Sequence, residues 1–313
     1  MELWSKIYIA GHRGMAGSAV MRRLEASGFT NFLTRTHTEL DLTNQTATRT
    51  FFESERPEYV VLAAAKVGGI HANSTYPGDF SLENLQVQTN VIEAAWVYGA
   101  KKLMFLGSAC IYPRLASQPM AETALLTGPL EPTNEWYAIA KIAGISLCDA
   151  LRLQYGFNTV SIMPNNLYGP GDNFNLENAH VLPALIRKFH EAKVKHSPEV
   201  VVWGTGAPLR EFIHVDDFSD AAVFLLKDYD NGGNINVGTG KDISIADVAR
   251  LVKEVVKYDG KIVFDESKPD GIPQKLLDCG KIHGLGWHAS IELRQGLEMT
   301  YAWFLQHEKT FRR

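Results

Sequence analysis

The chain has 313 residues, of which 45% are hydrophobic and 21% charged, and its formal net charge at pH 7 is -4. This length fits roughly two domains of ordinary size, and the composition is that of a soluble globular protein. The acidic balance and the lack of a long Lys/Arg block argue against nucleic acid or an anionic membrane as partner. No apolar run approaches the roughly 20 residues of a membrane span, and no signal-peptide core follows Met1, so we expect a cytoplasmic protein.

Strand-like and helical segments alternate through the first half of the chain. The predicted strands cover residues 6–11, 32–36, 59–65, 102–108 and 159–166, and the predicted helices cover residues 15–27, 48–55, 80–98 and 136–155. Apolar runs without alternation, separated by helices, are typical of a parallel sheet covered on both faces. The sequence therefore predicts an α/β fold with a doubly wound parallel sheet of the Rossmann type.

The regular alternation of strands and helices ends after residue 170, where shorter strands and helices indicate a second, smaller mixed α/β lobe. We expect residues 1–170 to form the Rossmann domain, with residues 208–230 returning to it. The predicted smaller lobe comprises residues 171–207 and 231–313.

Gly11, Gly14 and Gly17 stand in the turn between the first predicted strand and its helix. Glycines there allow a tight turn and a close approach of the backbone to a pyrophosphate at the helix N-terminus. The second predicted strand ends in Arg35-Thr36-His37, where an NAD enzyme usually carries a carboxylate for the ribose. With Arg13 in the glycine loop, these cations favour the 2′-phosphate of NADP(H), unless Arg35 and His37 are merely solvated.

Tyr137 and Lys141 are four residues apart on one predicted helix, so their side chains share a face. An ammonium beside a phenol favours the phenolate, and Tyr137 would then act as a general acid toward a carbonyl oxygen. Ser108, at the end of the fourth predicted strand, would donate a second hydrogen bond to that oxygen. A Tyr-x-x-x-Lys pair alone is commonly an exposed pair, but the glycine loop and Ser108 favour a catalytic role.

Three cysteines occur, Cys110, Cys148 and Cys279, and none lies in a C-x-x-C pair. An odd, widely spaced set indicates free thiols and neither a disulfide framework nor a zinc site. Cys148 and Cys279 fit small buried hydrophobes. Cys110 follows Ser108 by two residues at the end of a buried strand, where open α/β sheets hold their chemistry, although a packed thiol is the alternative.

These motifs resemble the extended short-chain dehydrogenase/reductase family over nearly the whole chain. The resemblance rests on the glycine loop, Asp41-Leu42, the alanines at 63–65, Asn90, Ser108, the Tyr137/Lys141 pair and residues 166–170. The segments GSACIYP (107–113), NNLYGPGDNF (165–174) and KPDGIPQKLLD (268–278) are similar to members that act on GDP-4-keto-6-deoxy-D-mannose. Those members epimerise C3 and C5 and then reduce the C4 ketone with NADPH.

The resemblance implies three sets of site residues and no metal. The implied catalytic residues are Ser108, Cys110, Tyr137, Lys141 and His180. The implied cofactor-binding residues are Gly11, His12, Arg13, Gly14, Met15, Gly17, Arg35, His37, Asp41, Leu42, Ala64, Ala65, Lys141, Pro164, Asn166, Leu167 and His180. The implied substrate-binding residues are Asn166, Lys188, Trp203, Arg210, Asp270 and Lys275. It also implies NADPH/NADP as cofactor, a nucleotide-sugar-binding role for the smaller lobe, and a homodimer formed through helices near residues 84–98 and 136–155.

The chemistry makes the implied catalytic set intelligible. Protons at C3 and C5 flank the C4 ketone, so removing either gives an enolate whose oxygen Ser108 and Tyr137 would stabilise. Inversion needs groups that remove and return protons, and a thiol and an imidazole both titrate near neutral pH. We assign Cys110 as base and His180 as acid, with the reverse roles open at either carbon.

Two other functions stay open from sequence. One is an NDP-sugar 4-epimerase that recycles tightly held NAD, and the other is a catalytically silent NADP-binding protein that kept the fold. For His180 the plain alternative is a surface or cap residue before a helix, and for the substrate residues it is solvated charges and a core aromatic. Fold alone does not separate these functions.

Overall fold

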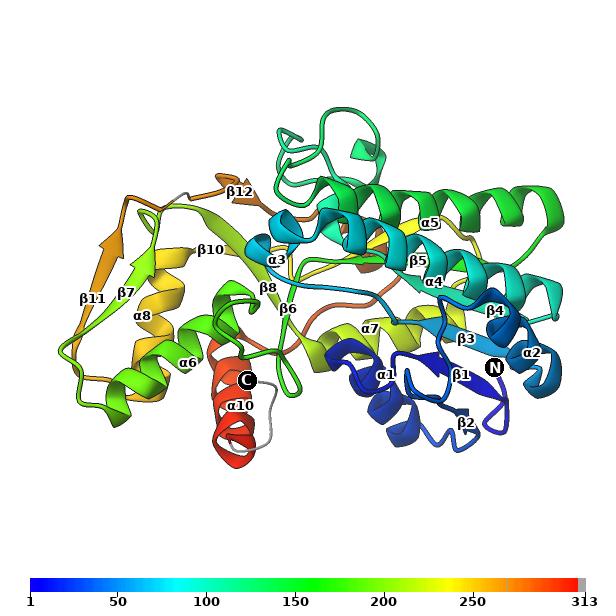
Figure 1. Ribbon diagram of the computed structural model, residues 1–313, viewed down its shortest axis with the longest axis horizontal. Helices are drawn as coiled ribbons and strands as arrows, with labels where there is room; N and C mark the ends of the chain where they lie inside the picture. Colours follow the sequence, from blue (N-terminus) through cyan, green and yellow to red (C-terminus); the bar gives the residue numbers. More distant parts are fainter. Residues whose placement is uncertain (269, 309–313) are drawn as a thin grey trace.

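The computed structural model describes residues 1–268 and 270–308. Its larger part is built on a six-stranded parallel sheet with the strand order β2-β1-β3-β4-β5-β9 (Figure 1). The strands are β1 (Ile7–Ala10), β2 (Phe32–Leu33), β3 (Tyr59–Leu62), β4 (Lys102–Leu106), β5 (Thr159–Pro164) and β9 (Asn234–Val237). The order reverses between β1 and β3, so the predicted doubly wound Rossmann-type sheet is confirmed.

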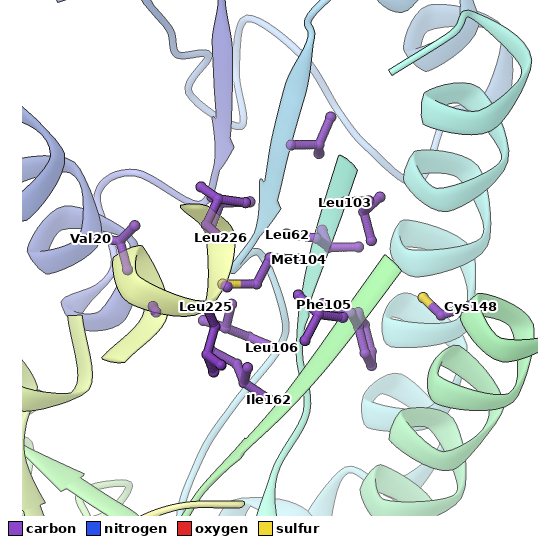
Figure 2. Close-up of a cluster of buried hydrophobic side chains, with 14 of the residues drawn as sticks. Val20, Leu62, Leu103, Met104, Phe105, Leu106, Cys148, Ile162, Leu225 and Leu226 are labelled. Carbon is purple, nitrogen blue, oxygen red and sulfur yellow. The ribbon is translucent and has the colours of Figure 1, made fainter. Parts of the chain in front are cut away.

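Helices cover both faces of this sheet. Helices α1 (Met15–Ala26) and α7 (Val215–Asp228) pack together, as do α2 (Gln45–Glu55), α4 (Pro77–Val97) and α5 (Glu135–Tyr155). Figure 2 shows Val20 of α1 and Leu225 of α7 on one side of β4 and Cys148 of α5 on the other. Cys148 is fully buried, as predicted for a packed thiol. The apolar strands thus sit between two helical layers.

The smaller part has its own sheets and its own core. Strand β8 (Leu209–His214) pairs with β10 (Asp242–Ser244), β12 (Gln274–Lys275) and β6 (Asn166–Tyr168), while β7 (Glu199–Trp203) pairs with β11 (Lys261–Asp265). The helices are α6 (Val181–Val194), α8 (Ile245–Val256) and α10 (Leu293–His307). Buried Phe189, Val252 and Phe304 belong to a core cluster separate from that of the large sheet. The predicted mixed α/β architecture is therefore present.

Three strands lie elsewhere than predicted. Strand β9 was expected in the smaller lobe, but it pairs in parallel with β5 and forms an edge of the large sheet. Its Ile235 and Val237 are fully buried, so the pairing covers apolar side chains next to β5. Strand β8 was expected to return to the first domain with α7, and β6 was expected in that domain, but the two strands pair with each other in the smaller sheet, and α7 alone packs against α1 and β5. The remaining division between the domains stays a prediction.

Local boundaries also differ from the sequence-based ones. The second strand is only two residues long, and β3 ends at Leu62, three residues early. Helix α2 begins at Gln45, three residues early, because Asn44 caps it by accepting a hydrogen bond from the Ala47 amide at 3.0 Å. The short helices α3 (Ile70–Thr75) and α9 (Gly280–Gly284), and the 3-10 turns η1 (Ala109–Ile111) and η2 (Glu122–Ala124), were not predicted. Among the described helices, none is both long and apolar enough to cross a bilayer.

Candidate active site

The glycine loop between β1 and α1 leaves no room for side chains at two of its positions. Gly11 has a φ of +86°, and a Cβ there would lie 2.7 Å from the Ala64 backbone nitrogen. A Cβ at Gly17 would lie 2.3 Å from the Gly11 carbonyl oxygen. Gly14 precedes α1, and its amide donates to the Gly11 carbonyl at 2.9 Å. At its three glycines the loop carries no side chain, so a dinucleotide pyrophosphate can approach the backbone before α1 closely.

Polar atoms around this loop also fit a dinucleotide. The His12 Nδ1 atom is buried and has no hydrogen-bond partner among the described residues. The Asn90 amide donates to the carbonyls of Leu42 and Thr43 at 2.9 and 3.0 Å and fixes the chain after β2. The other predicted cofactor residues follow these strands in the chain: Met15 begins α1, Ala64 and Ala65 come after β3, Pro164 ends β5, and Asn166 and Leu167 lie on β6. The carboxyl ends of β1, β3 and β5 thus meet at one site, at the edge where open α/β sheets bind ligands.

The region predicted to bind a ribose 2′-phosphate is only partly free. The Arg35 guanidinium pairs with Glu55 at 2.8 Å and lies 5.2 Å from the Phe51 ring centroid. His37 is 83% exposed and lies 4.0 Å from Asp41. Arg13 is exposed and forms no ion pair with the described residues. Arg13 is therefore the more available cation, and Arg35 would have to share its charge with Glu55.

A carboxylate that the sequence-based reasoning missed lies in the same region. The Thr36 amide and hydroxyl donate to Glu39 at 2.7 and 2.8 Å. These hydrogen bonds, followed by the positive charges of Arg35 and Arg13, lower the pKa of Glu39. Its position two residues before Asp41 places it after the second strand, where dinucleotide-binding folds often carry an acid, and that was the available signal.

Ser108, Tyr137 and Lys141 come together at the end of β4. The Lys141 Nζ donates to the Leu106 carbonyl at 2.7 Å and lies 5.8 Å from the Tyr137 ring centroid. Burial lowers the pKa of Lys141 to about 7. Burial and the nearby Cys110 raise the pKa of Tyr137, while a hydrogen bond with the Ser108 side chain lowers it. In this structure the Lys141 ammonium is directed to the Leu106 carbonyl, so the expected stabilisation of a phenolate stays a prediction.

Cys110 points to polar partners and not into the core. Its Sγ accepts a hydrogen bond from the Asn134 amide at 3.3 Å and one from the Lys275 ammonium at 3.6 Å. The thiol lines a small cavity together with Arg114 and Glu131, which form an ion pair at 3.3 Å. By contrast, burial raises the pKa values of the other two thiols, Cys148 and Cys279.

His180 immediately precedes α6 and is held by the chain before it. The Gly69 amide donates to the Asn178 carbonyl at 3.1 Å, and a Cβ at Gly69 would lie 2.9 Å from the Ala179 carbonyl oxygen. His180 keeps an exposed surface, but the surrounding protein and then the charge of Lys275 lower the pKa of its imidazole. Lys275 is thus electrostatically linked to both predicted acid–base residues.

Four of the predicted substrate residues form a separate group on the smaller lobe. Trp203 is 62% exposed, and the ammonium groups of Lys188 and Lys268 lie 5.4 and 5.7 Å from its ring. Asp270 accepts hydrogen bonds from the Thr205 amide and hydroxyl at 2.7 and 2.8 Å. Burial lowers the pKa of Arg210, while the charge of Asp270 raises it. An open aromatic face among cations suits a base and a pyrophosphate.

Two predicted substrate residues lie outside that group. Lys275 is beside Cys110, and Asn166 donates to the Glu211 carbonyl at 2.7 Å. The sequence-based reasoning missed Asn134 as a partner of Cys110. Its position directly before α5 and three residues before Tyr137 was the available signal, because asparagine is favoured at such helix starts.

Comparisons with known proteins agree with this geometry. The profile of the NAD dependent epimerase/dehydratase family matches residues 7–238. GDP-L-fucose synthase 1 of Arabidopsis thaliana is 60% identical over 303 residues, which cover 97% of this chain and 94% of the relative. GDP-L-fucose synthase of Escherichia coli K12 is 52% identical over 316 residues, with 98% of both chains covered. A GDP-mannoheptose C4 reductase from Campylobacter jejuni with NADP bound has a TM-score of 0.90 at 42% identity, covering 97% of this chain and 99% of that one.

Proposed function

Because the chain belongs to the NAD dependent epimerase/dehydratase family, with GDP-L-fucose synthases among its relatives at 52 and 60% identity, we propose that it converts GDP-4-keto-6-deoxy-D-mannose to GDP-L-fucose. It is then an NADPH-dependent oxidoreductase with epimerase activity. The observation that supports this most is the placement of Cys110, hydrogen-bonded to Lys275, close to the Ser108 and Tyr137 hydroxyls. A thiol among polar partners beside the ketone site suits the removal of a proton, a step that reduction of C4 alone does not need.

The residues around the glycine loop would hold NADP(H). The loop and the N-terminus of α1 bind the pyrophosphate, Arg13 with a contribution from Arg35 binds the 2′-phosphate, and Lys141 holds the nicotinamide ribose. Bound NADPH supplies the hydride that reduces the C4 ketone. A C4 reductase with similar structure contains NADP, which supports this choice over NAD.

The two epimerisations depend on the C4 ketone. Ser108 and Tyr137 donate hydrogen bonds to the ketone oxygen and so stabilise the enolate that forms when a proton leaves C3 or C5. Cys110 takes that proton, and His180 returns one to the opposite face. The lowered pKa favours the neutral imidazole at rest, and His180 keeps an exposed surface through which it can take up the proton that it returns. The same arrangement also allows His180 to act as base and Cys110 as acid at either C3 or C5.

Reduction completes the reaction. Tyr137 carries its proton at neutral pH and is hydrogen-bonded with Ser108, so it can protonate the C4 alkoxide as hydride arrives. The group formed by Lys188, Trp203, Arg210 and Asp270 would bind the GDP moiety, since cations suit the pyrophosphate and an exposed indole suits the base.

We also propose a cytoplasmic homodimer. Three free thiols fit a reducing compartment. On α4 and α5, Trp96 and Tyr155 stack at 4.4 Å, and Leu153 is 91% exposed. Leu82 on α4 and Ile139 on α5 are exposed as well. Apolar side chains gathered on two neighbouring helices suit burial against a second copy of the same pair.

The test is to mix the purified protein with GDP-4-keto-6-deoxy-D-mannose, follow NADPH oxidation and identify the product by NMR. Wild type should form GDP-L-fucose, Cys110→Ser should reduce without inverting or should stall, and Tyr137→Phe should lose reduction. Cys148→Ala, which removes a thiol from the core, is the matched control and should keep the product unchanged. If wild type reduces C4 without inversion, it is a plain C4 reductase. If it leaves NADPH untouched, the NAD-dependent 4-epimerase or the silent binder replaces this proposal.

A further inference from the structure

Lys275 reaches Cys110 from the other lobe. It lies on β12, which pairs in parallel with β8 so that Lys275 is opposite Arg210. Its Nζ is 3.6 Å from the Cys110 sulfur, although 165 positions separate the two residues in the chain. Lys275 forms no salt bridge within residues 1–268 and 270–308, so a carboxylate does not compete for its charge. The contact joins a second-lobe cation to a thiol of the Rossmann domain.

A buried glutamate anchors the strand that carries Lys275. Glu211 is fully buried, and its carboxylate accepts hydrogen bonds from the Asn165 side chain at 2.8 Å and the Leu277 amide at 2.9 Å. The same Asn165 amide group donates to the Lys275 carbonyl at 3.1 Å. Glu211 therefore holds the backbone at Lys275 and just after it, through Asn165 at the Lys275 carbonyl and directly at the Leu277 amide.

The other oxygen of Glu211 fixes a third segment. The amides of Thr239 and Gly240 donate to Glu211 Oε1 at 2.7 and 2.8 Å. A Cβ at Gly238 would lie 2.2 Å from this oxygen, so the turn closes tightly on the carboxylate. Four N–H groups thus donate to the buried Glu211 carboxylate, which has no cationic partner among the described residues. A glutamine in its place could not accept all four hydrogen bonds, because its NH2 group is a donor.

The polar and titratable groups near Cys110 and Lys275 come from several elements. Lys275 on β12, Tyr137 on α5 and Asn134 just before α5 lie near the thiol, and the charge of Lys275 also acts on His180. Arg114 and Glu131 line the same cavity but compensate each other in an ion pair at 3.3 Å. Tyr137 and His180 are neutral near pH 7, so Lys275 supplies the net charge beside the sulfur.

We propose that Lys275 stabilises the thiolate of Cys110 by donating to its sulfur, and that Glu211 is a positioning residue that holds Lys275 in that place. The catalytic meaning of this contact rests on the proposed epimerisation, in which Cys110 removes a proton. The contact itself does not depend on the substrate. Lys275 is then a partner of the base and not a ligand of the nucleotide.

The test is the rate at which iodoacetamide, a neutral reagent, alkylates Cys110 between pH 6 and 9, read by peptide mass spectrometry. Cys148 and Cys279 are buried and should react little, and Cys110→Ser marks the background. An opposite charge within hydrogen-bond reach favours the ionised form by about tenfold or more, so Lys275→Met should slow alkylation at pH 7 by about tenfold and Lys275→Arg should restore much of it. Lys261→Met is the matched control on β11, at the outer edge of the smaller lobe in Figure 1, and should leave the rate unchanged.

Glu211→Gln should slow alkylation to a similar degree, with Asn165→Ala as a second variant that removes one link if Glu211→Gln does not fold. A wild-type rate in Lys275→Met overturns the proposal, and a wild-type rate in a folded Glu211→Gln or Asn165→Ala overturns the role of Glu211. Failure of the proposed function would appear differently. The GDP-sugar would then be left unconverted while alkylation still depended on Lys275.

Discussion

Replacing Lys141 by methionine should make the protein more stable while removing its reductase activity. Lys141 is 3% exposed, and burial lowers its pKa from 10.5 to about 7. Each pKa unit corresponds to about 1.4 kcal/mol, so below pH 7 the buried Lys141 ammonium lowers the free energy of unfolding by about 5 kcal/mol. The substitution also leaves the Leu106 carbonyl without its donor, which costs about 1–3 kcal/mol, and removes the contact at 4.7 Å with the Phe105 ring. The expected net gain at pH 6 is about 1–3 kcal/mol.

The pH dependence of this gain identifies its cause. The unfolded chain binds a proton at Lys141 below pH 10.5, whereas the folded chain binds it only below about pH 7. Wild-type stability should therefore rise across this interval, because the unfolded state holds more protons there. By pH 9 the penalty at Lys141 has fallen to about 2 kcal/mol, so the advantage of Lys141→Met should shrink by about 3 kcal/mol between pH 6 and 9.

The assay is urea unfolding of the nucleotide-free protein at pH 6 and pH 9, with thermal melting as a second measure. Lys102→Met is the contrasting control: burial lowers the pKa of Lys102 as well, but Asp230 at 3.1 Å opposes that shift, and the ammonium also donates to two carbonyls. Removing that satisfied lysine should lower the free energy of unfolding. The reasoning is refuted if Lys141→Met is less stable than wild type at pH 6, or if its advantage is the same at both pH values.

Three further changes test other parts of the site. Gly17→Ala forces a Cβ against the Gly11 carbonyl and should raise the NADPH dissociation constant at least about tenfold by fluorescence titration, whereas Gly78→Ala, with open space around it, should not. Trp203→Ala should raise KM for the GDP-sugar about tenfold to a hundredfold with little change in kcat, because a stacked base is worth about 1–3 kcal/mol; an unchanged KM would remove the indole from the nucleotide site. Leu153→Lys should convert a dimer to a monomer in light scattering, and a dimer that persists would place the interface elsewhere.

The sequence predicted those features that neighbouring residues encode. The glycine loop could be found because Gly11 and Gly17 serve a turn formed by their own strand and helix. The face shared by Tyr137 and Lys141 follows from helical periodicity, but periodicity does not say which acceptor the ammonium reaches, and here it is the Leu106 carbonyl. The acceptor of the Lys141 ammonium therefore could not be predicted from the sequence.

Features made by distant segments could not be predicted in the same way. The position of β9 depends on the open edge of β5, some 70 residues earlier, and a short apolar run fits either lobe equally well. The contact of Lys275 with Cys110 joins two lobes, and the lysine itself carries no local sign of its partner. The role of Glu211 could not be predicted for a related reason, because the N–H groups that donate to its carboxylate come from three separate segments of the chain.

The place of β9 at the edge of the large sheet has a consequence for the chain as it leaves the ribosome. Until residue 237 has emerged, β5 pairs only with β4, so its other edge, which includes the buried Ile162, stays unpaired. The smaller lobe begins to be made in that interval, since α6 and β7 precede β9 in the chain. An N-terminal fragment that stops near residue 170 should therefore aggregate and not behave as a separate domain. The Rossmann sheet is completed only after part of the other lobe has been synthesised.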